Sequence, residues 1–231
     1  MQPADRKNFF IPSPYQIPLE VFGVVDAAKL AFQFSNLTKQ KKGNGERILV
    51  FPGFNTDDPY TYFLRSFLNQ IGYNAQGWEI GKNHGNVPVL LETLNAKIRK
   101  EYNEHKEKII LIGWSLGGYL AREVARDNQE LVSKVITLAS PIVGGPKYTS
   151  IARVFPLNGI TIDELEKEID ERYKNPLKLP VLAIYSKKDN IVGWEACIDN
   201  LSPNTKHVEI DSTHIGFIVN VEAYKLISEF L

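Results

Sequence analysis

The chain has little cysteine, no surplus of either charge and no long apolar run. A single cysteine among 231 residues excludes a framework of intrachain disulfides. The 27 Lys and Arg residues balance the 27 Asp and Glu residues, and no basic block is longer than residues 39–42, so nothing indicates a nucleic-acid partner. The longest apolar stretch near the N-terminus, residues 21–34, is interrupted by Asp26, Lys29 and Gln33. No transmembrane helix is therefore expected.

The length and composition suit one sizeable hydrophobic core. Hydrophobic residues make up 43% of the chain, and we expect a single domain over residues 1–231. The first residues lead into no secretory apolar core with a small-residue cleavage site, so the cytoplasm is the expected compartment.

Residues 1–45 are expected to form an N-terminal helical extension. Within it, residues 19–37 carry two sets of side chains at helical spacing, which predicts an amphipathic helix. The apolar set is Val21, Val24, Val25, Ala28, Ala31 and Phe32, and the polar set is Asp26, Lys29, Gln33 and Asn36. Packing of this helix on the protein's own core is favoured over a position on a lipid surface, because its polar side is only weakly basic.

After residue 45, short apolar runs alternate with helical patterns. The runs predict strands over residues 47–51, 73–80, 108–113, 135–138, 181–185 and 206–210. The helical patterns cover residues 60–71, 87–105, 118–125, 162–173 and 219–231. This alternation predicts an α/β fold with a mainly parallel, about six-stranded sheet and helices on both faces. It fails only between residues 140 and 180, where we expect a small lid-like insertion or, as an equal alternative, a surface excursion without a gating role.

The most apolar run ends in the sequence Gly113-Trp114-Ser115-Leu116-Gly117, and a helical pattern follows it. This strand, turn and helix context indicates a nucleophile elbow. Glycine is needed two residues before and two after the serine, because Cβ atoms there would collide with the strand and the helix. The pattern predicts Ser115 as a nucleophile and the N–H of Leu116 as a hydrogen-bond donor to an oxyanion.

A serine nucleophile needs a base, and the chain offers four histidines. His214 is favoured because it lies in the loop between the last predicted strand and the terminal helix. His105 lies at a charged helix end, His207 falls inside a predicted strand, and His84 lies in the loop after the second strand.

The acid that orients the base is expected in the loop after the preceding strand. Asp189 stands there and completes the chain order Ser, Asp, His. Asp211 is the alternative, although it lies only three residues from His214. Asp163 and Asp170 belong to the charged helical run and are expected to face solvent.

The loop after the first core strand is expected to supply the second oxyanion donor. Gly53 allows a tight turn there, and the N–H of Phe54 is the predicted partner of the Leu116 N–H. Apolar side chains gather around the inferred site, which favours an apolar acyl group, although half of them could simply fill the core. Those expected to contact substrate are Trp114, Ile142, Val143, Trp194 and Ile215. No motif specifies a metal or a cofactor.

Taken in order, these segments resemble the α/β-hydrolase superfamily, and within it the bacterial lipase and esterase-like serine hydrolases with a small lid. The likeness extends from residue 47 to residue 231 and is carried by residues 51–54, 81–85, 113–117, 137–141, 185–194 and 212–214. The chain departs from that pattern twice. A helix and not an antiparallel hairpin precedes the first strand, which implies a reduced, six-stranded sheet. The oxyanion loop also lacks a His-Gly-Gly-Gly run.

The resemblance implies a nucleophile at Ser115, an acid at Asp189, a base at His214 and oxyanion N–H groups at Phe54 and Leu116. The expected function is hydrolysis of a small-molecule carboxylic ester with an apolar acyl group through an acyl-serine intermediate, without a cofactor. A thioesterase or amide hydrolase would use the same residues. A hydrolase-fold protein that only binds a ligand or a partner is the alternative from another class. The sequence leaves peripheral membrane contact and the oligomeric state open.

Overall fold

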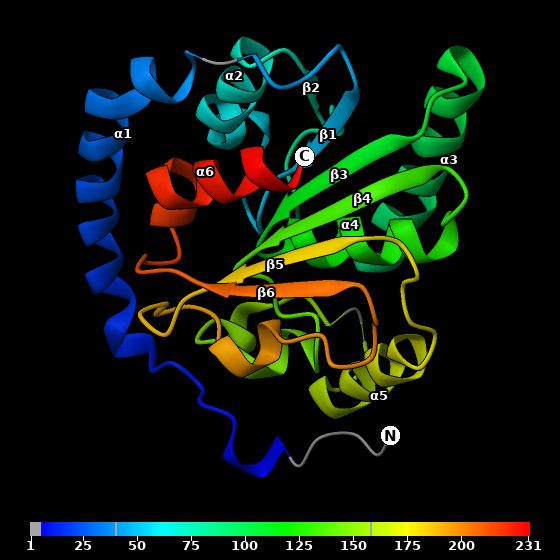
Figure 1. Ribbon diagram of the computed structural model, residues 1–231. Coiled ribbons are helices and arrows are strands. Elements are labelled where there is room, and N and C mark those ends of the chain that lie inside the picture. Colours follow the sequence, from blue (N-terminus) through cyan, green and yellow to red (C-terminus); the bar gives the residue numbers. More distant parts are fainter. Residues whose placement is uncertain (1–5, 40, 158) are drawn as a thin grey trace.

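A six-stranded sheet forms the centre of the molecule (Figure 1). The computed structural model describes residues 6–39, 41–157 and 159–231. The strands pair in the order β2-β1-β3-β4-β5-β6 and are all parallel. They are β1 (Arg47–Phe51), β2 (Asn74–Gly77), β3 (Ile109–Trp114), β4 (Val132–Leu138), β5 (Val181–Tyr185) and β6 (Thr205–Glu209). The predicted α/β class and six-stranded sheet are confirmed.

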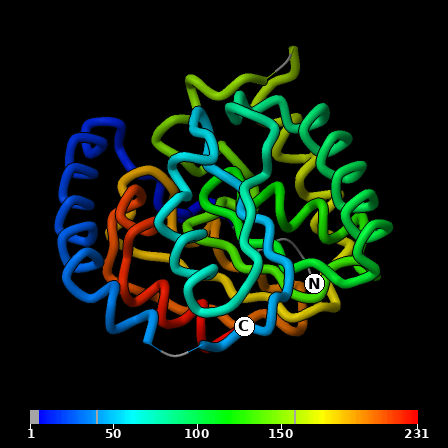
Figure 2. Tube along the Cα trace, turned by 90° about the horizontal axis from the view of Figure 1, so that it is seen from above, coloured from blue at the N-terminus to red at the C-terminus, as the bar shows by residue number. Residues whose placement is uncertain are grey.

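Helices cover both faces of the sheet, as expected for parallel strands. The α-helices are α1 (Gly23–Leu37), α2 (Tyr62–Gln70), α3 (Val87–His105), α4 (Leu116–Asp127), α5 (Ile162–Tyr173) and α6 (Val221–Phe230). Ile48 and Val50 of β1 share one core with α1, α2 and α6, while Leu49 and Phe51 share the other with α3 and α4. Figures 1 and 2 both show α1 beside α6. Within the described ranges, no helix is long and apolar enough to cross a bilayer.

The second strand is shorter than its sequence pattern predicts, because a side chain takes over its hydrogen bonding. The predicted strand over residues 73–80 ends at Gly77. The next two backbone N–H groups, of Trp78 and Glu79, donate to the two carboxylate oxygens of Asp58 at 3.0 Å each. Asp58 belongs to the short 3-10 helix Asp58–Thr61 that precedes α2.

The segment between β4 and β5 contains two 3-10 helices, Gly145–Tyr148 and Ala152–Val154, followed by α5. Ion pairs hold α5 on two sides. Lys147 pairs with Asp163 at 2.6 Å and with Glu166 at 2.7 Å. On the other side, Arg172 bonds to Glu123 of α4. Ion pairs thus hold α5 to the first 3-10 helix of the insertion and to α4.

The N-terminal helix is present, but the apolar set predicted for its inner face points outward, and Leu30, Phe34 and Leu37 pack on the core instead. A 3-10 helix, Pro14–Phe22, leads directly into α1. The residues that α1 buries are Gly23, Asp26 and Leu30. Every side chain of the predicted apolar set faces solvent, and Phe32 is 89% exposed. Residues 1–5 of the expected extension lie outside the described residues.

Polar groups at the edge of the sheet explain this inversion. Buried backbone and hydroxyl donors need acceptors, and the loops after β5 and β6 present several. Asp26 accepts a hydrogen bond from the hydroxyl of Ser212 at 3.1 Å. The helix also approaches closely at a glycine, since a Cβ atom on Gly23 would lie 3.0 Å from the backbone nitrogen of Gly216. Polar contacts and close backbone approach hold this helix in place together with Leu30, Phe34 and Leu37, which pack on the core.

A buried ionic network surrounds α4. The guanidinium of Arg122 is fully buried and bonds to Asp199, which also accepts a hydrogen bond from the Tyr173 hydroxyl at 3.0 Å. Burial raises the pKa of Asp199, but the charge of Arg122 and the hydrogen bonds of Ser202 outweigh it and lower that pKa to about 2. This carboxylate is therefore ionised throughout the neutral range.

The Asp199 pair predicts a pH dependence of stability. A carboxyl group whose pKa is lower in the folded state stabilises above its unfolded pKa, which is near 3.8, and loses that contribution as the pH falls toward 2. The loss is on the order of 2 kcal/mol. Asp199→Asn should lower the free energy of unfolding at pH 7 by about 3 to 5 kcal/mol, because Arg122 stays buried without its partner.

Urea unfolding at pH 7, 5, 4 and 3 measures this effect. Asp199→Asn should lose less stability than the wild type between pH 5 and pH 3. Asp211→Asn is the matched control, because Asp211 is 70% exposed, and it should follow the wild-type curve. Parallel curves for the wild type and Asp199→Asn would contradict the prediction.

Candidate active site

Ser115 lies in a strained turn between β3 and α4. Its backbone has φ 56° and ψ −125°, a conformation that residues other than glycine rarely adopt. Its N–H donates to the carbonyl of Leu138 at 2.8 Å, and its own carbonyl accepts from Gly118 at 3.0 Å. The side chain is 7% exposed. The turn has the geometry of the predicted nucleophile elbow.

The glycines on either side of the serine allow backbone segments to touch. A Cβ atom on Gly113 would lie 2.3 Å from the carbonyl carbon of Gly117. One on Gly117 would lie 2.3 Å from the carbonyl oxygen of Phe51, at the end of β1. The elbow and the loop after β1 are therefore in direct backbone contact.

Asp189 and His214 form a hydrogen-bonded pair beside this turn. The Asp189 Oδ2 to His214 Nδ1 distance is 2.7 Å, and both residues are 4% exposed. The other carboxylate oxygen of Asp189 accepts the backbone N–H groups of Ile191 and Val192, each at 2.7 Å. The carboxylate is thus fixed by three contacts, and His214 Nε2 is the ring nitrogen left for another partner.

Trp114, the residue before Ser115, holds His214 next to the elbow. Its indole N–H donates to the carbonyl of His214 at 3.0 Å, and the two ring centroids are 5.4 Å apart. The structure thereby brings the predicted nucleophile, base and acid into one neighbourhood. Trp114 itself packs in the core, so its hydrogen bond ties His214 to the protein interior.

The alternatives considered from the sequence lie elsewhere. Asp211 pairs with Lys188 at 2.6 Å on the surface. His207 Nε2 accepts the backbone N–H of Asp199 at 2.9 Å, and burial lowers its pKa. His84 and His105 are exposed. Burial also raises the pKa of the only cysteine, Cys197, so its thiol is not an activated nucleophile.

A buried asparagine that the sequence analysis did not single out organises the candidate oxyanion loop. Asn83 donates through its side-chain amide to the carbonyl of Pro52 at 2.9 Å. Its backbone carbonyl accepts from Asn55 at 2.7 Å, and its N–H donates to Thr56 at 2.8 Å. These hydrogen bonds of Asn83 fix the backbone on both sides of Phe54, at Pro52 and at Asn55. Among the described residues, no hydrogen bond occupies the N–H of Phe54 or of Leu116.

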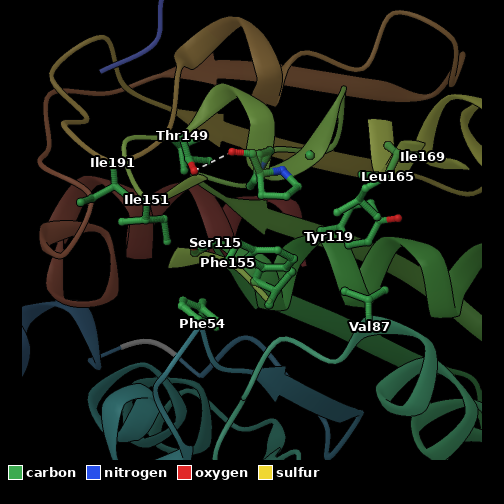
Figure 3. Close-up of a pocket in the computed structure, with 15 residues that line it drawn as sticks. Phe54, Val87, Ser115, Tyr119, Thr149, Ile151, Phe155, Leu165, Ile169 and Ile191 are labelled. Carbon is green, nitrogen blue, oxygen red and sulfur yellow. Dashed lines mark hydrogen bonds between the residues drawn. The ribbon is translucent and has the colours of Figure 1, made fainter. Parts of the chain in front are cut away.

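A narrow, apolar pocket begins at Ser115 and runs beneath the insertion (Figure 3). It encloses about 500 Å³ of empty space, its open mouth included. In Figure 3, Thr149, Ile151 and Ile191 lie on one side of the serine, and Tyr119, Leu165 and Ile169 lie on the other. Phe54, Val87, Leu116 and Phe155 also line it. Most of these side chains are hydrocarbon, so the pocket suits a slender apolar group.

The five residues expected to contact substrate are not in the lining of this pocket. Trp114 supports His214, and Ile142 and Val143 are buried in the protein interior. Trp194 stacks on Tyr185 at a centroid distance of 5.8 Å. Ile215 is about half exposed beside His214. The lining comes instead from the loops after β1, β4 and β5 and from residues of α3, α4 and α5, which lie far apart in the sequence.

Solved structures similar to this one include lipolytic enzymes and a putative bromoperoxidase. A structure of the metagenome-derived lipolytic enzymes LipS and LipT matches with a TM-score of 0.59 and 17% identity, over 81% of this chain and 92% of that one. A monoacylglycerol lipase from Paleococcus ferrophilus matches with a TM-score of 0.60 and 16% identity, over 80% and 95%. A putative non-heme bromoperoxidase, BpoC from Mycobacterium tuberculosis, matches with a TM-score of 0.55 and 18% identity, over 81% and 92%. At such identities the likeness shows the fold.

The search of curated proteins gave no match to this sequence. The sequence model of one family, the PGAP1-like alpha/beta domain, matches residues 32–213. That range includes Ser115 and Asp189 and ends immediately before His214. Because the match covers most of the chain and the fold agrees, this protein belongs to the PGAP1-like alpha/beta domain family of the α/β-hydrolase superfamily.

Proposed function

We propose that the protein is a serine hydrolase that cleaves carboxylic esters of apolar acyl groups. The observation that carries the proposal is the 2.7 Å bond between Asp189 and His214 beside a strained serine turn at the end of an apolar pocket. A nucleophile, an oriented base and a hydrocarbon-lined site for the acyl group then lie together, which is what acyl transfer requires.

Acylation begins with attack of the Ser115 hydroxyl oxygen on the ester carbonyl carbon. His214 accepts the serine proton at Nε2, because the Asp189 carboxylate accepts the Nδ1 hydrogen and so fixes the tautomer. The carbonyl oxygen becomes an oxyanion. The N–H groups of Phe54 and Leu116 stabilise it, and the positive end of the α4 dipole adds to that effect.

Collapse of the tetrahedral intermediate breaks the bond to the leaving alcohol, which takes the proton from His214. The acyl group stays on Ser115 as an ester, with its chain in the apolar pocket. Water then attacks this ester, His214 accepts the water proton and returns it to the serine oxygen, and the carboxylic acid leaves. No step calls for a group other than this chain, substrate and water.

The nucleophile is tested with the wild type and Ser115→Ala, which should fold alike. A fluorophosphonate probe should label only the wild type. Hydrolysis of p-nitrophenyl esters should fall by about 10⁴-fold or more in the variant, because no acyl-enzyme can form. A folded wild-type protein that neither reacts with the probe nor hydrolyses these esters would overturn the proposed function and leave a binding protein.

Two aspartates on neighbouring loops provide a matched test of the acid. Asp189→Asn should lower kcat by about 10³ to 10⁴-fold, because the amide no longer fixes the working tautomer of His214. Asp211→Asn makes the same chemical change at an exposed site and should alter kcat less than about threefold. Steady-state kinetics on one soluble ester compares them. Equal losses in the two variants would rule out the assignment of Asp189.

The pocket is tested by filling it. Leu165→Trp adds bulk to the lining, so the preferred acyl chain should become shorter and kcat/KM for the longest good substrate should fall by about 10-fold or more. The acetyl ester should be cleaved almost as before. Val154→Trp makes a similar change on the insertion at an exposed residue outside the lining, and it should keep the wild-type chain-length profile. An unchanged profile in Leu165→Trp would place the acyl group elsewhere.

A further inference from the structure

A buried carboxylate from the N-terminal segment bonds to both loops of the Asp189 and His214 pair. Glu20 lies near the end of the 3-10 helix Pro14–Phe22 and is only 3% exposed. Its Oε1 accepts the backbone N–H of Asn190 at 3.1 Å and the side-chain amide of the same residue at 3.0 Å. Its Oε2 accepts the backbone N–H of Ile215 at 2.8 Å.

The donors to Glu20 are the residues next to the acid and the base in the sequence. Asn190 directly follows Asp189, and Ile215 directly follows His214. One carboxylate therefore joins the two loops at the residues next to the acid and the base. Hydrogen bonds to an ionised acceptor are roughly twice as strong as neutral ones, so this bridge restrains both loops.

The two loops have few other mutual restraints. They come from the ends of β5 and β6. Outside the Asp189 to His214 bond, they are linked by the N–H of Ser212, which donates to the Ser186 hydroxyl at 3.3 Å, and by the exposed ion pair of Lys188 with Asp211 at 2.6 Å. A small rotation of either loop would lengthen the 2.7 Å bond on which the base depends. Glu20 opposes such a rotation from outside the sheet.

The segment that carries Glu20 is itself fixed. Ser13 and Gln16 form a capping box at the start of its helix. Three residues before Ser13, the carbonyl oxygen of Phe10 lies against Gly193, only 2.1 Å from where a Cβ atom of Gly193 would lie. After it, Asp26 bonds to Ser212. The segment that carries Glu20 is therefore anchored both before and after this residue.

We propose that Glu20 is a positioning residue of the active site, which holds the acid loop and the base loop at the spacing that the Asp189 to His214 bond needs. The expected effect of Glu20 on turnover rests on the proposed function, whereas its expected effect on the Asp189 to His214 hydrogen bond does not. Glu20 lies before residue 32, where the family match begins, so a segment outside that match completes the site.

Replacement of Glu20 should affect turnover more than substrate binding. Glu20→Ala removes the acceptor that three donors of the two loops share, and displacement of catalytic groups by about 1 Å can cost about 10²-fold. We expect kcat to fall about 10 to 100-fold, with KM changed less than about threefold, because Glu20 does not line the pocket. Glu20→Gln keeps one oxygen acceptor but turns an NH₂ group toward the other loop, so its kcat should be intermediate.

The experiment measures kcat, KM and the low-field proton resonance of His214 Nδ1–H in the full-length wild type, both variants and a control. The control is Glu130→Gln, the same chemical change at an exposed residue. The proposal expects an intact resonance in the wild type and the control, and a shifted or broadened one in the Glu20 variants. If Glu20→Ala does not fold, the nearly isosteric Glu20→Gln decides.

The outcomes separate this proposal from the proposed function. Wild-type kcat and an unchanged resonance in folded Glu20→Gln, even with a lower melting temperature, would reduce Glu20 to a structural anchor and overturn the proposal. If the wild type hydrolyses no ester, the proposed function fails, and the resonance alone decides the role of Glu20. Its loss in Glu20→Gln would support the bridge, and its retention would overturn it.

Discussion

The contact between the first turn of α4 and the backbone at the end of β1 is the constraint on which the site depends. Gly117 lies so close to the carbonyl of Phe51 that no side chain fits between them. Any larger residue would push α4 away from the sheet. The turn before it must then take the left-handed conformation seen at Ser115, which points the serine away from the core and toward the loops at the carboxyl edge.

Those loops are irregular, and each is held by one buried or half-buried side chain that makes several hydrogen bonds to backbone groups. Asp58 accepts hydrogen bonds from the backbone just after β2, and Asn83 bonds to the loop after β1. Glu20 accepts hydrogen bonds from the loops after β5 and β6. A parallel sheet leaves the backbone groups just beyond the carboxyl ends of its strands without partners in the sheet. Side chains from other parts of the sequence replace the missing partners and give the edge a defined shape.

The regular part of this architecture could be predicted from the sequence, because buried parallel strands are continuous apolar runs. The same logic placed Asp189 and His214 after two successive strands, and the structure brings them within hydrogen-bond distance. The pocket could not be predicted in this way, since its lining combines the loops after β1, β4 and β5 with residues of α3, α4 and α5 that are far apart in the sequence. The orientation of α1 was not predictable either. Its inward face combines Leu30, Phe34 and Leu37 with the buried Asp26, while the other apolar residues of the helix face solvent, so the sequence carries two competing apolar faces.

The inverted orientation of α1 has a consequence for local motions of the protein. Polar contacts with the loops, through Asp26 and Glu20, are part of what docks this helix and the segment before it, and they can open without unfolding of the sheet. The amide hydrogens of Asn190 and Ile215 are shielded by Glu20, a residue about 170 and 195 positions earlier in the chain. Their exchange with deuterium therefore follows the docking of the N-terminal segment, while the amides inside β5 report on the sheet itself.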